Sequence, residues 1–222
     1  MKAFLKNLLL PKGSAPRVIR GGLFRGLRFK MDFAHQTQLW LGLQERELAR
    51  WFRNLSEGIH TAIDVGASEG IYTLYFLART PARKVLSFEP SSENVAVICR
   101  NLELNGLETD SRLQIVGKFA GTRQDQQHAT LDSFCPSIEF PCLVKIDVDG
   151  GEVDVLRGAQ TLLELPGTRW IIEVHSEELK KECLRILEDK DYRISVVPNA
   201  WWRAFIPELR PIELNHWLVA TR

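Results

Sequence analysis

Hydrophobic positions along this chain follow two alternating spacings. Between residues 37 and 55 they recur every three or four positions, which predicts a helix packed on the core. Further on, short apolar runs alternate with segments of helical spacing. The runs predict strands at 60–65, 84–89, 112–116, 142–148, 169–175, 192–197 and 215–221, and the segments predict helices at 71–79, 92–105, 152–165 and 177–190.

This order predicts an α/β fold. Strands that alternate with helices form parallel βαβ units, with helices on both faces of one sheet. The last two strands have no helix between them, so we expect them to pair antiparallel.

Charge is distributed unevenly. The chain has 29 Lys and Arg against 28 Asp and Glu, for a formal net charge of +1. Residues 1–31 hold eight basic side chains and no acidic one, which leaves −7 for the rest. We therefore expect a basic N-terminal extension, residues 1–35, and a single mildly acidic domain, residues 36–222. The extension is expected to be solvated or to make a peripheral contact with an acidic surface.

Composition narrows the class of protein. Hydrophobic content of 45% and charged content of 26% are typical of a folded soluble domain and exclude a wholly disordered chain. There is no apolar run long enough to span a membrane. The four cysteines show no C-x-x-C spacing, which disfavours a zinc knuckle or dithiol site, so we expect a reducing, cytoplasmic setting. The oligomeric state stays open.

A glycine turn follows the first strand, at the end where open α/β sheets bind ligands. Its sequence is Asp64-Val65-Gly66-Ala67-Ser68-Glu69-Gly70. Glycines at 66 and 70 permit a tight turn and close approach of a ligand to the backbone. Ser68 stands where the G-x-G-x-x-G dinucleotide fingerprint has glycine. An ordinary strand-to-helix turn is an equal interpretation of this stretch.

The second strand ends in Glu89-Pro90, 19 residues after Gly70. In βαβ units an acidic residue near this spacing binds ribose hydroxyls. A carboxylate can accept hydrogen bonds from both hydroxyls at once. Together with the glycine turn, Glu89 favours a nucleoside-binding site over a solvated carboxylate.

The fourth strand ends with Lys145, Asp147 and Asp149 on one side. These groups could orient a hydroxyl, hold a cationic cofactor or bind a divalent ion. Because there is no D-x-D-x-D-G loop and no histidine nearby in sequence, we expect no metal. Asp147 is the favoured functional residue, whereas Glu152 is explained equally well by the preference of acids for helix starts.

Two further stretches carry candidate chemistry. Glu173 and His175 share one face of the fifth strand, where the carboxylate would raise the basicity of the imidazole. His175 is therefore the best general-base candidate. A structural role for this histidine is the alternative. Trp201 and Trp202 lie in a loop and could stack on a sugar or cap a cofactor, or else seal the rim of the core.

The chain resembles the FkbM-type S-adenosylmethionine-dependent methyltransferases. The matching stretches are A-I-D-V-G-A-S-E-G-I-Y-T at 62–73, F-E-P-S-S-E-N at 88–94, N-G-L at 105–107, T-L-D at 130–132, L-V-K-I-D-V-D-G-G-E-V-D-V-L-R-G-A at 143–159, I-I-E-V-H at 171–175 and the terminal W-L-V-A-T-R. The resemblance implies a class I methyltransferase sheet, Rossmann-like and mostly parallel, with a reversed last strand.

The resemblance also implies roles for residues. The cofactor S-adenosyl-L-methionine would be lined by Asp64 and the turn residues Gly66, Ala67, Ser68 and Gly70, with Glu89 on its ribose beside Pro90. Asp147 would face the methyl group. Substrate-side candidates are Lys145, Glu173, Trp201 and Trp202.

The resulting hypothesis is an O-methyltransferase acting on a hydroxyl of a sugar, a glycan or a small molecule. In-line transfer depends on alignment, assisted by a base, for which His175 and Asp147 are the candidates. Three alternatives stay open. A nicotinamide-dependent oxidoreductase is disfavoured by Ser68, and a nucleic-acid methyltransferase by the lack of an N-P-P-Y-like pocket; a non-catalytic nucleoside-binding protein would need no acid/base cluster.

Overall fold

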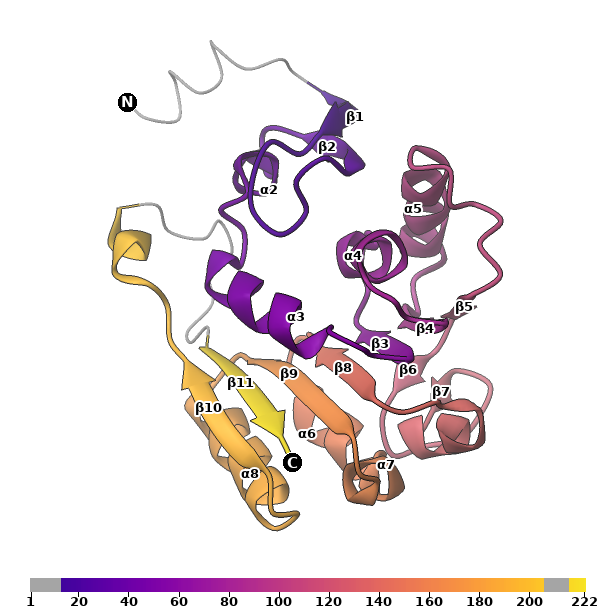
Figure 1. The fold of residues 1–222 in the computed structure, drawn as a ribbon, viewed down its shortest axis with the longest axis vertical. Helices are drawn as coiled ribbons and strands as arrows, with labels where there is room; N and C mark the ends of the chain where they lie inside the picture. Colours follow the sequence, from indigo (N-terminus) through magenta and orange to yellow (C-terminus); the bar gives the residue numbers. More distant parts are fainter. Residues whose placement is uncertain (1–12, 206–215) are drawn as a thin grey trace.

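The computed structural model describes residues 13–205 and 216–222, and its centre is a seven-stranded sheet (Figure 1). The strand order is β10-β11-β9-β8-β3-β4-β5. The strands are β3 (Thr61–Val65), β4 (Lys84–Phe88), β5 (Leu113–Val116), β8 (Cys142–Ile146), β9 (Thr168–Val174), β10 (Arg193–Val197) and β11 (His216–Thr221). From β9 to β5 all neighbours are parallel, whereas β11 runs antiparallel to both β9 and β10. The predicted α/β fold with a reversed last strand is confirmed.

Helices cover both faces of the sheet (Figure 1). One face carries α3 (Ala49–Leu55), α4 (Ile71–Arg79) and α5 (Ser92–Glu103). Their apolar side chains share a buried cluster with Ala62 of β3 and Leu143 of β8. The other face carries α6 (Glu152–Arg157), α7 (Gln160–Glu164) and α8 (Glu177–Glu188), which pack with Ile63 and Val144. Neighbouring residues of one strand thus enter different clusters, as the pleat requires.

A hairpin of β1 (Ser14–Val18) and β2 (Arg28–Asp32) packs on the α3–α5 face. Its Phe29 and Met31 are fully buried in the cluster of that face. Asn105, which follows α5, holds β2 by accepting from Arg28 N–H (2.9 Å) and donating to the Arg28 carbonyl (2.7 Å). The domain division at residue 35 stays a prediction, but hydrophobic side chains on both sides of it share one core. Residues 1–12 lie outside the described part of the chain.

Two predicted helices are interrupted. The segment 37–55 divides into α2 (Thr37–Leu41), a 3₁₀ turn η1 (Arg46–Leu48) and α3, because Gly42 adopts a left-handed φ of 74°. A Cβ on Gly42 would lie 2.0 Å from the Gly21 carbonyl carbon, so the close approach of these two segments requires glycine.

The second interruption lies between α6 and α7. A Cβ on Gly158 would lie 1.9 Å from the carbonyl oxygen of Gly121, which shows how closely the two backbones pack there. The chain resumes as α7 where the Asp132 carboxylate accepts from the N–H groups of Thr161 and Leu162, both at 2.9 Å. The acid of the T-L-D stretch therefore caps this helix.

The segment 117–141, irregular in the sequence, contains three short elements. These are β6 (Phe119–Ala120), β7 (His128–Ala129) and the 3₁₀ helix η2 (Leu131–Ser137), and a further 3₁₀ helix, η3, spans Trp201–Ala204. None of the helices within the described ranges has the length and apolarity needed to cross a membrane.

Candidate functional site

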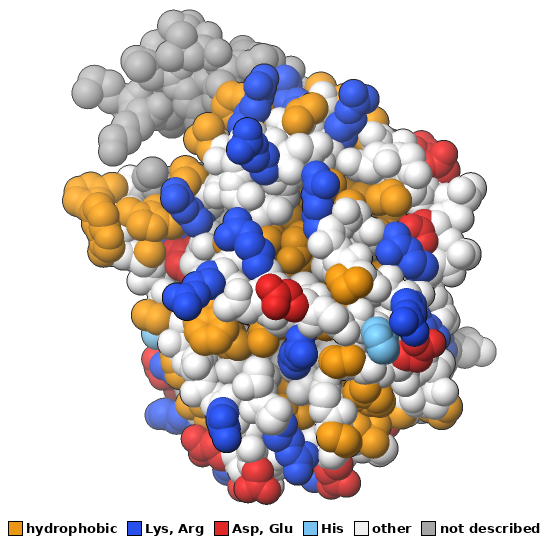
Figure 2. All heavy atoms as spheres, viewed as in Figure 1, with side chains coloured by type: hydrophobic (Ala, Val, Ile, Leu, Met, Phe, Trp, Pro, Cys, Tyr) orange, Lys and Arg blue, Asp and Glu red, His pale blue; other side chains and the backbone are white. Residues whose placement is uncertain are grey.

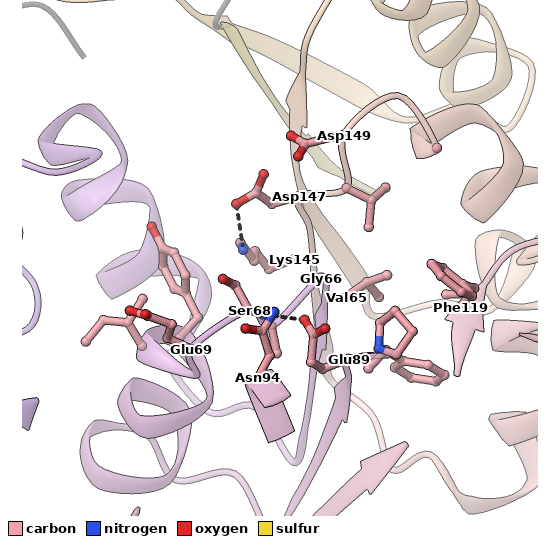
Figure 3. Close-up of a pocket in the computed structure, with 18 of the residues that line it drawn as sticks. Val65, Gly66, Ser68, Glu69, Glu89, Asn94, Phe119, Lys145, Asp147 and Asp149 are labelled. Carbon is pink, nitrogen blue, oxygen red and sulfur yellow. Dashed lines mark hydrogen bonds and ion pairs between the residues drawn. The ribbon is translucent and has the colours of Figure 1, made fainter. Parts of the chain in front are cut away.

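A pocket of about 690 Å³ opens at the carboxyl ends of β3, β4 and β8 (Figure 3). Residues 66–69 of the glycine turn after β3, Glu89-Pro90 after β4 and Lys145 with Asp147 from the end of β8 line it. Gly70 does not line the pocket, so its contact with a cofactor stays a prediction. Tyr72 of α4 and Phe119 of β6 also line the pocket. Three strand ends thus meet where ligands bind in parallel α/β sheets.

The glycine turn packs directly against the end of β8. Gly66 has a φ of +78°, and a Cβ there would lie 1.9 Å from the backbone oxygen of Asp147. The N–H groups of Gly66 and Ala67 donate to the Phe88 carbonyl, at 3.1 and 3.0 Å. Gly66 is therefore required both by its left-handed conformation and by the neighbouring strand.

Glu89 is held by the turn it faces. Its Oε2 accepts from the N–H of Ser68 at 2.8 Å and its Oε1 from the N–H of Ser91 at 2.9 Å (Figure 3). The residue is only 5% exposed, yet it lines the pocket. Two backbone donors fix the carboxylate and leave it acceptor capacity for a ligand.

Lys145, which lines the pocket, links two carboxylates. Its Nζ lies 3.1 Å from Asp147 Oδ2 and 3.7 Å from Asp64 Oδ1, above the ring of Tyr72. Burial alone lowers the pKa of Lys145, but the surrounding carboxylates, Asp147 first, outweigh burial and raise it. Lys145 therefore stays a cation inside the site.

Asp64 does not line the pocket. It is fully buried, and its Oδ2 accepts from Thr73 Oγ1 at 2.8 Å. Burial raises the pKa of its carboxyl, which Lys145 partly opposes. Its expected contact with a cofactor stays a prediction; the contacts observed are with Lys145 and Thr73.

Glu45 is a pocket residue that the sequence pattern does not single out. It is 7% exposed, and its Oε2 accepts from the Tyr72 hydroxyl at 2.5 Å. Burial raises the pKa of Glu45, and the charge of Asp147 raises it further. Glu45 follows the break at Gly42, so only a helix interruption predicted from that glycine could have placed it at the site.

His175 and Glu173 lie beside Asp147 but do not line the pocket. The His175 Nδ1 lies 2.5 Å from Glu152 Oε1, and Glu152 is fully buried. This hydrogen bond raises the pKa of His175; burial opposes the shift, and the charges of Glu152, Asp147 and Asp149 add to it. Glu152, explained in the sequence by its helix start, thus also orients His175.

Neither tryptophan lines the pocket. Trp201 is 81% exposed and meets the ring of Phe205 edge-on. Trp202 lies under the guanidinium of Arg203, whose Nε donates to Glu47 Oε1 at 2.9 Å. The loop is therefore anchored to η1 through Arg203, and contact of either indole with an acceptor stays a prediction.

Comparison with known proteins finds a family model that matches part of this chain and solved structures that share its fold. Residues 104–194 match the family described as methyltransferase FkbM domain. Among solved structures, the chain is similar to methyltransferase FkbM from Methylobacillus flagellatus KT, with 19% identity and a TM-score of 0.59. That match covers 73% of this chain but only 44% of the other. No curated protein matches the sequence.

Two further structures share the fold. The precorrin-6y C5,15-methyltransferase from Geobacter metallireducens GS-15 matches with 12% identity and a TM-score of 0.53, over 81% of this chain and 88% of that one. TYW2 from M. jannaschii, solved in complex with AdoMet, matches with 13% identity and a TM-score of 0.53, over 95% and 86%. At these identities the similarity supports the fold.

Proposed function

We propose that this chain uses S-adenosyl-L-methionine to methylate a hydroxyl oxygen. Its match to the methyltransferase FkbM domain, over residues 104–194, confirms the resemblance found in the sequence and supports this proposal. The acceptor class we propose is a sugar, a glycan or a small molecule. The observation that carries the proposal is the Glu89 carboxylate, fixed by two backbone N–H groups at the edge of a pocket formed by three strand ends.

The pocket has suitable chemistry for each part of this cofactor. Glu89 would accept from the two ribose hydroxyls, as acidic residues at this position do in βαβ nucleoside sites. Phe119 and Phe88 would supply apolar contact for the adenine ring. The volume of about 690 Å³ lies within the range of small-molecule sites.

The charge of the site supports a cationic ligand. Asp147, Asp149 and Glu45 line the pocket and Glu173 lies buried just behind it, whereas Lys145 and Lys118 are the cations that line it among the described residues. A sulfonium would be attracted by this excess of carboxylates, and the attraction is strong because the surroundings are largely buried.

Of the two candidate bases, Asp147 is the one we place next to the reacting atoms, because Asp147 lines the pocket whereas His175 does not. Methyl transfer requires the acceptor oxygen in line with the sulfur–methyl bond, and that alignment supplies much of the rate. The acceptor proton would pass to a base. We propose Asp147 as that base; His175, whose Nε2 lies 3.8 Å from Asp147 Oδ1, would act on it electrostatically, because that distance is too long for a hydrogen bond.

A basic face offers a second contact for partners. Figure 2 shows lysine and arginine side chains spread over the face that includes α3 and the β1–β2 hairpin. The exposed members from these elements and their connections are Arg20, Arg25, Arg28, Arg46, Arg50 and Arg53. We propose that this face contacts an acidic surface or acidic acceptor, with salt-dependent affinity. The proposed setting is the cytoplasm, because the four cysteines are free thiols.

The proposal is tested by measuring cofactor binding and methyl transfer in a matched pair of variants. Glu89→Gln keeps the shape of the side chain but loses the charge, and we expect S-adenosylhomocysteine to bind about 10- to 100-fold more weakly, as for lost hydrogen bonds to a charged group. Glu93→Gln removes a nearby acid that does not line the pocket, and its affinity should equal that of the wild type. Transfer of labelled methyl groups to hydroxyl acceptors, followed by mass spectrometry, then identifies the acceptor. Equal affinities in the two variants would contradict the proposal.

A further inference from the structure

Glu45 reaches the pocket from outside the sheet. It lies in the connection between α2 and η1 and is buried, yet it lines the pocket. Its φ of +44° falls in the left-handed region, which residues other than glycine rarely adopt. Strained backbone of this kind persists where the surrounding structure serves a function, so we asked which group the Glu45 carboxylate is placed to bind.

The helix that follows the glycine turn holds this carboxylate. Glu45 Oε2 accepts from the Tyr72 hydroxyl at 2.5 Å, and the side-chain amide of Gln44 donates to Oε1 at 3.4 Å. Tyr72 belongs to the first turn of α4. A carboxylate accepts about four hydrogen bonds, so Glu45 keeps acceptor capacity for a ligand.

Tyr72 also places Glu45 close to a cation. The Lys145 Nζ lies 4.6 Å from the centroid of the Tyr72 ring, whose hydroxyl donates to Glu45. Lys145 is buried and lines the pocket as well. One wall of the pocket thus holds a buried carboxylate and a buried ammonium group close together, and this pair is complementary to the zwitterion of an amino acid.

This wall lies across the pocket from Glu89. In the sheet β3 separates β8, which carries Lys145, from β4, which leads to Glu89. Neighbouring strands are about 4.8 Å apart, so the ends of β4 and β8 are separated by about 10 Å. A nucleoside with its ribose at Glu89 and its adenine at Phe119, as proposed above, therefore extends its 5′ substituent toward Lys145 and Glu45.

The segment that carries Glu45 is anchored on both sides. Upstream, the Gln36 side chain donates to the carboxylate of Glu69 in the glycine turn. Downstream in the chain, Arg203 donates to the Leu43 carbonyl at 3.1 Å, two residues before Glu45. These contacts position the carboxylate before any ligand binds, and such preorganisation lowers the entropic cost of binding.

We propose that Glu45, held by Tyr72, binds the α-ammonium group in the amino-acid chain of the cofactor. This inference rests on the proposed function and adds to it the residue that recognises the end of the cofactor away from adenine. An ammonium group has three donors, and its hydrogen bonds to a carboxylate are charge-assisted. Burial raises the pKa of Glu45, and a bound ammonium group would offset that effect.

Two ligands that differ by one group test this contact. S-adenosylhomocysteine carries the α-amino group, whereas its deaminated analogue keeps the adenosine, the sulfur and the carboxylate without it. Calorimetry on the full chain measures both affinities. We expect the wild type to bind S-adenosylhomocysteine about 10- to 100-fold more tightly than the analogue, as for hydrogen bonds between charged groups. Glu45→Gln should lose most of this preference through weaker binding of S-adenosylhomocysteine, with the affinity for the analogue within about threefold of the wild type.

Glu89→Gln is the matched comparison, because its expected contact is with the ribose that both ligands share. It should weaken both ligands by the same factor and leave the preference intact. Tyr72→Phe keeps the ring but removes the hydroxyl that holds Glu45, and it should reduce the preference about three- to tenfold. Circular dichroism selects the folded variants, and Tyr72→Phe carries the test if Glu45→Gln fails to fold.

The outcomes separate the two hypotheses. A wild type that binds both ligands equally well, or a preference that survives in Glu45→Gln and Tyr72→Phe, would overturn the role of Glu45 and leave the proposed function standing. A wild type that binds neither ligand would refute the proposed function, and the inference with it.

Discussion

Gly66→Ala tests whether the glycine turn is built by its contact with β8. The alanine Cβ would lie 1.9 Å from the Asp147 carbonyl oxygen, at a φ of +78°. The left-handed conformation costs alanine about 1–2 kcal/mol, and forcing an extra methyl into packed surroundings costs about 1–3 kcal/mol more. We therefore expect a loss of about 2–5 kcal/mol in the free energy of unfolding.

Gly58→Ala is the matched control. Gly58 also has a left-handed φ, +67°, but a Cβ there meets nothing within 4 Å. It should lose only the conformational part, about 1–2 kcal/mol. Urea denaturation measures both variants, and calorimetry measures S-adenosylhomocysteine affinity, which we expect to fall at least tenfold in Gly66→Ala alone. Equal stability of the two variants, with unchanged affinity, would refute the reasoning.

Three further substitutions test other contacts of the site. Lys145→Met removes the ammonium beside the fully buried Asp64 carboxylate and should lower the free energy of unfolding by about 3–5 kcal/mol in urea titrations; an unchanged midpoint would contradict this. Burial raises the pKa of the Glu47 carboxyl, but hydrogen bonds from Arg203 outweigh burial and hold this pKa below its ordinary value of 4.5. The ionised Glu47 therefore stabilises the fold above pH 4.5, and this stabilisation is lost as the pH falls through the folded pKa. Glu47→Gln should therefore be less stable than the wild type at pH 7, with the difference shrinking below about pH 4.5; a constant difference would refute the assignment. Trp201→Ala removes an 81% exposed side chain, so stability should change by less than about 0.5 kcal/mol while the acceptor KM rises; an unchanged KM removes Trp201 from acceptor binding.

The sheet could be predicted because its signal is local. Each strand is a short apolar run, and each connection has helical spacing or none, so the order of elements and the reversed last strand follow from the sequence alone. The helix break at Gly42 was not predicted, because α2 and α3 both turn apolar residues inward and the combined pattern of apolar positions is typical of one continuous helix. Only the close approach of Gly21 requires the turn there.

The site could be predicted in part for the same reason. Strand ends identify Gly66, Glu89 and Asp147, which the structure brings to one pocket. The pairing of Glu152 with His175 joins residues 23 positions apart and depends on where α6 begins relative to β9, which no sequence spacing encodes. The position of Glu45 in the pocket likewise depends on the helix break at Gly42, which was not predicted from the sequence.

The most direct test of the central claim is a crystal structure of the chain with S-adenosylhomocysteine. The account predicts the ligand in the pocket at the ends of β3, β4 and β8, with both ribose hydroxyls within hydrogen-bond distance of the Glu89 carboxylate. Its sulfur should lie on the side of Asp147. Density for the ligand elsewhere on the chain, or a ribose that makes no contact with Glu89, would contradict the account.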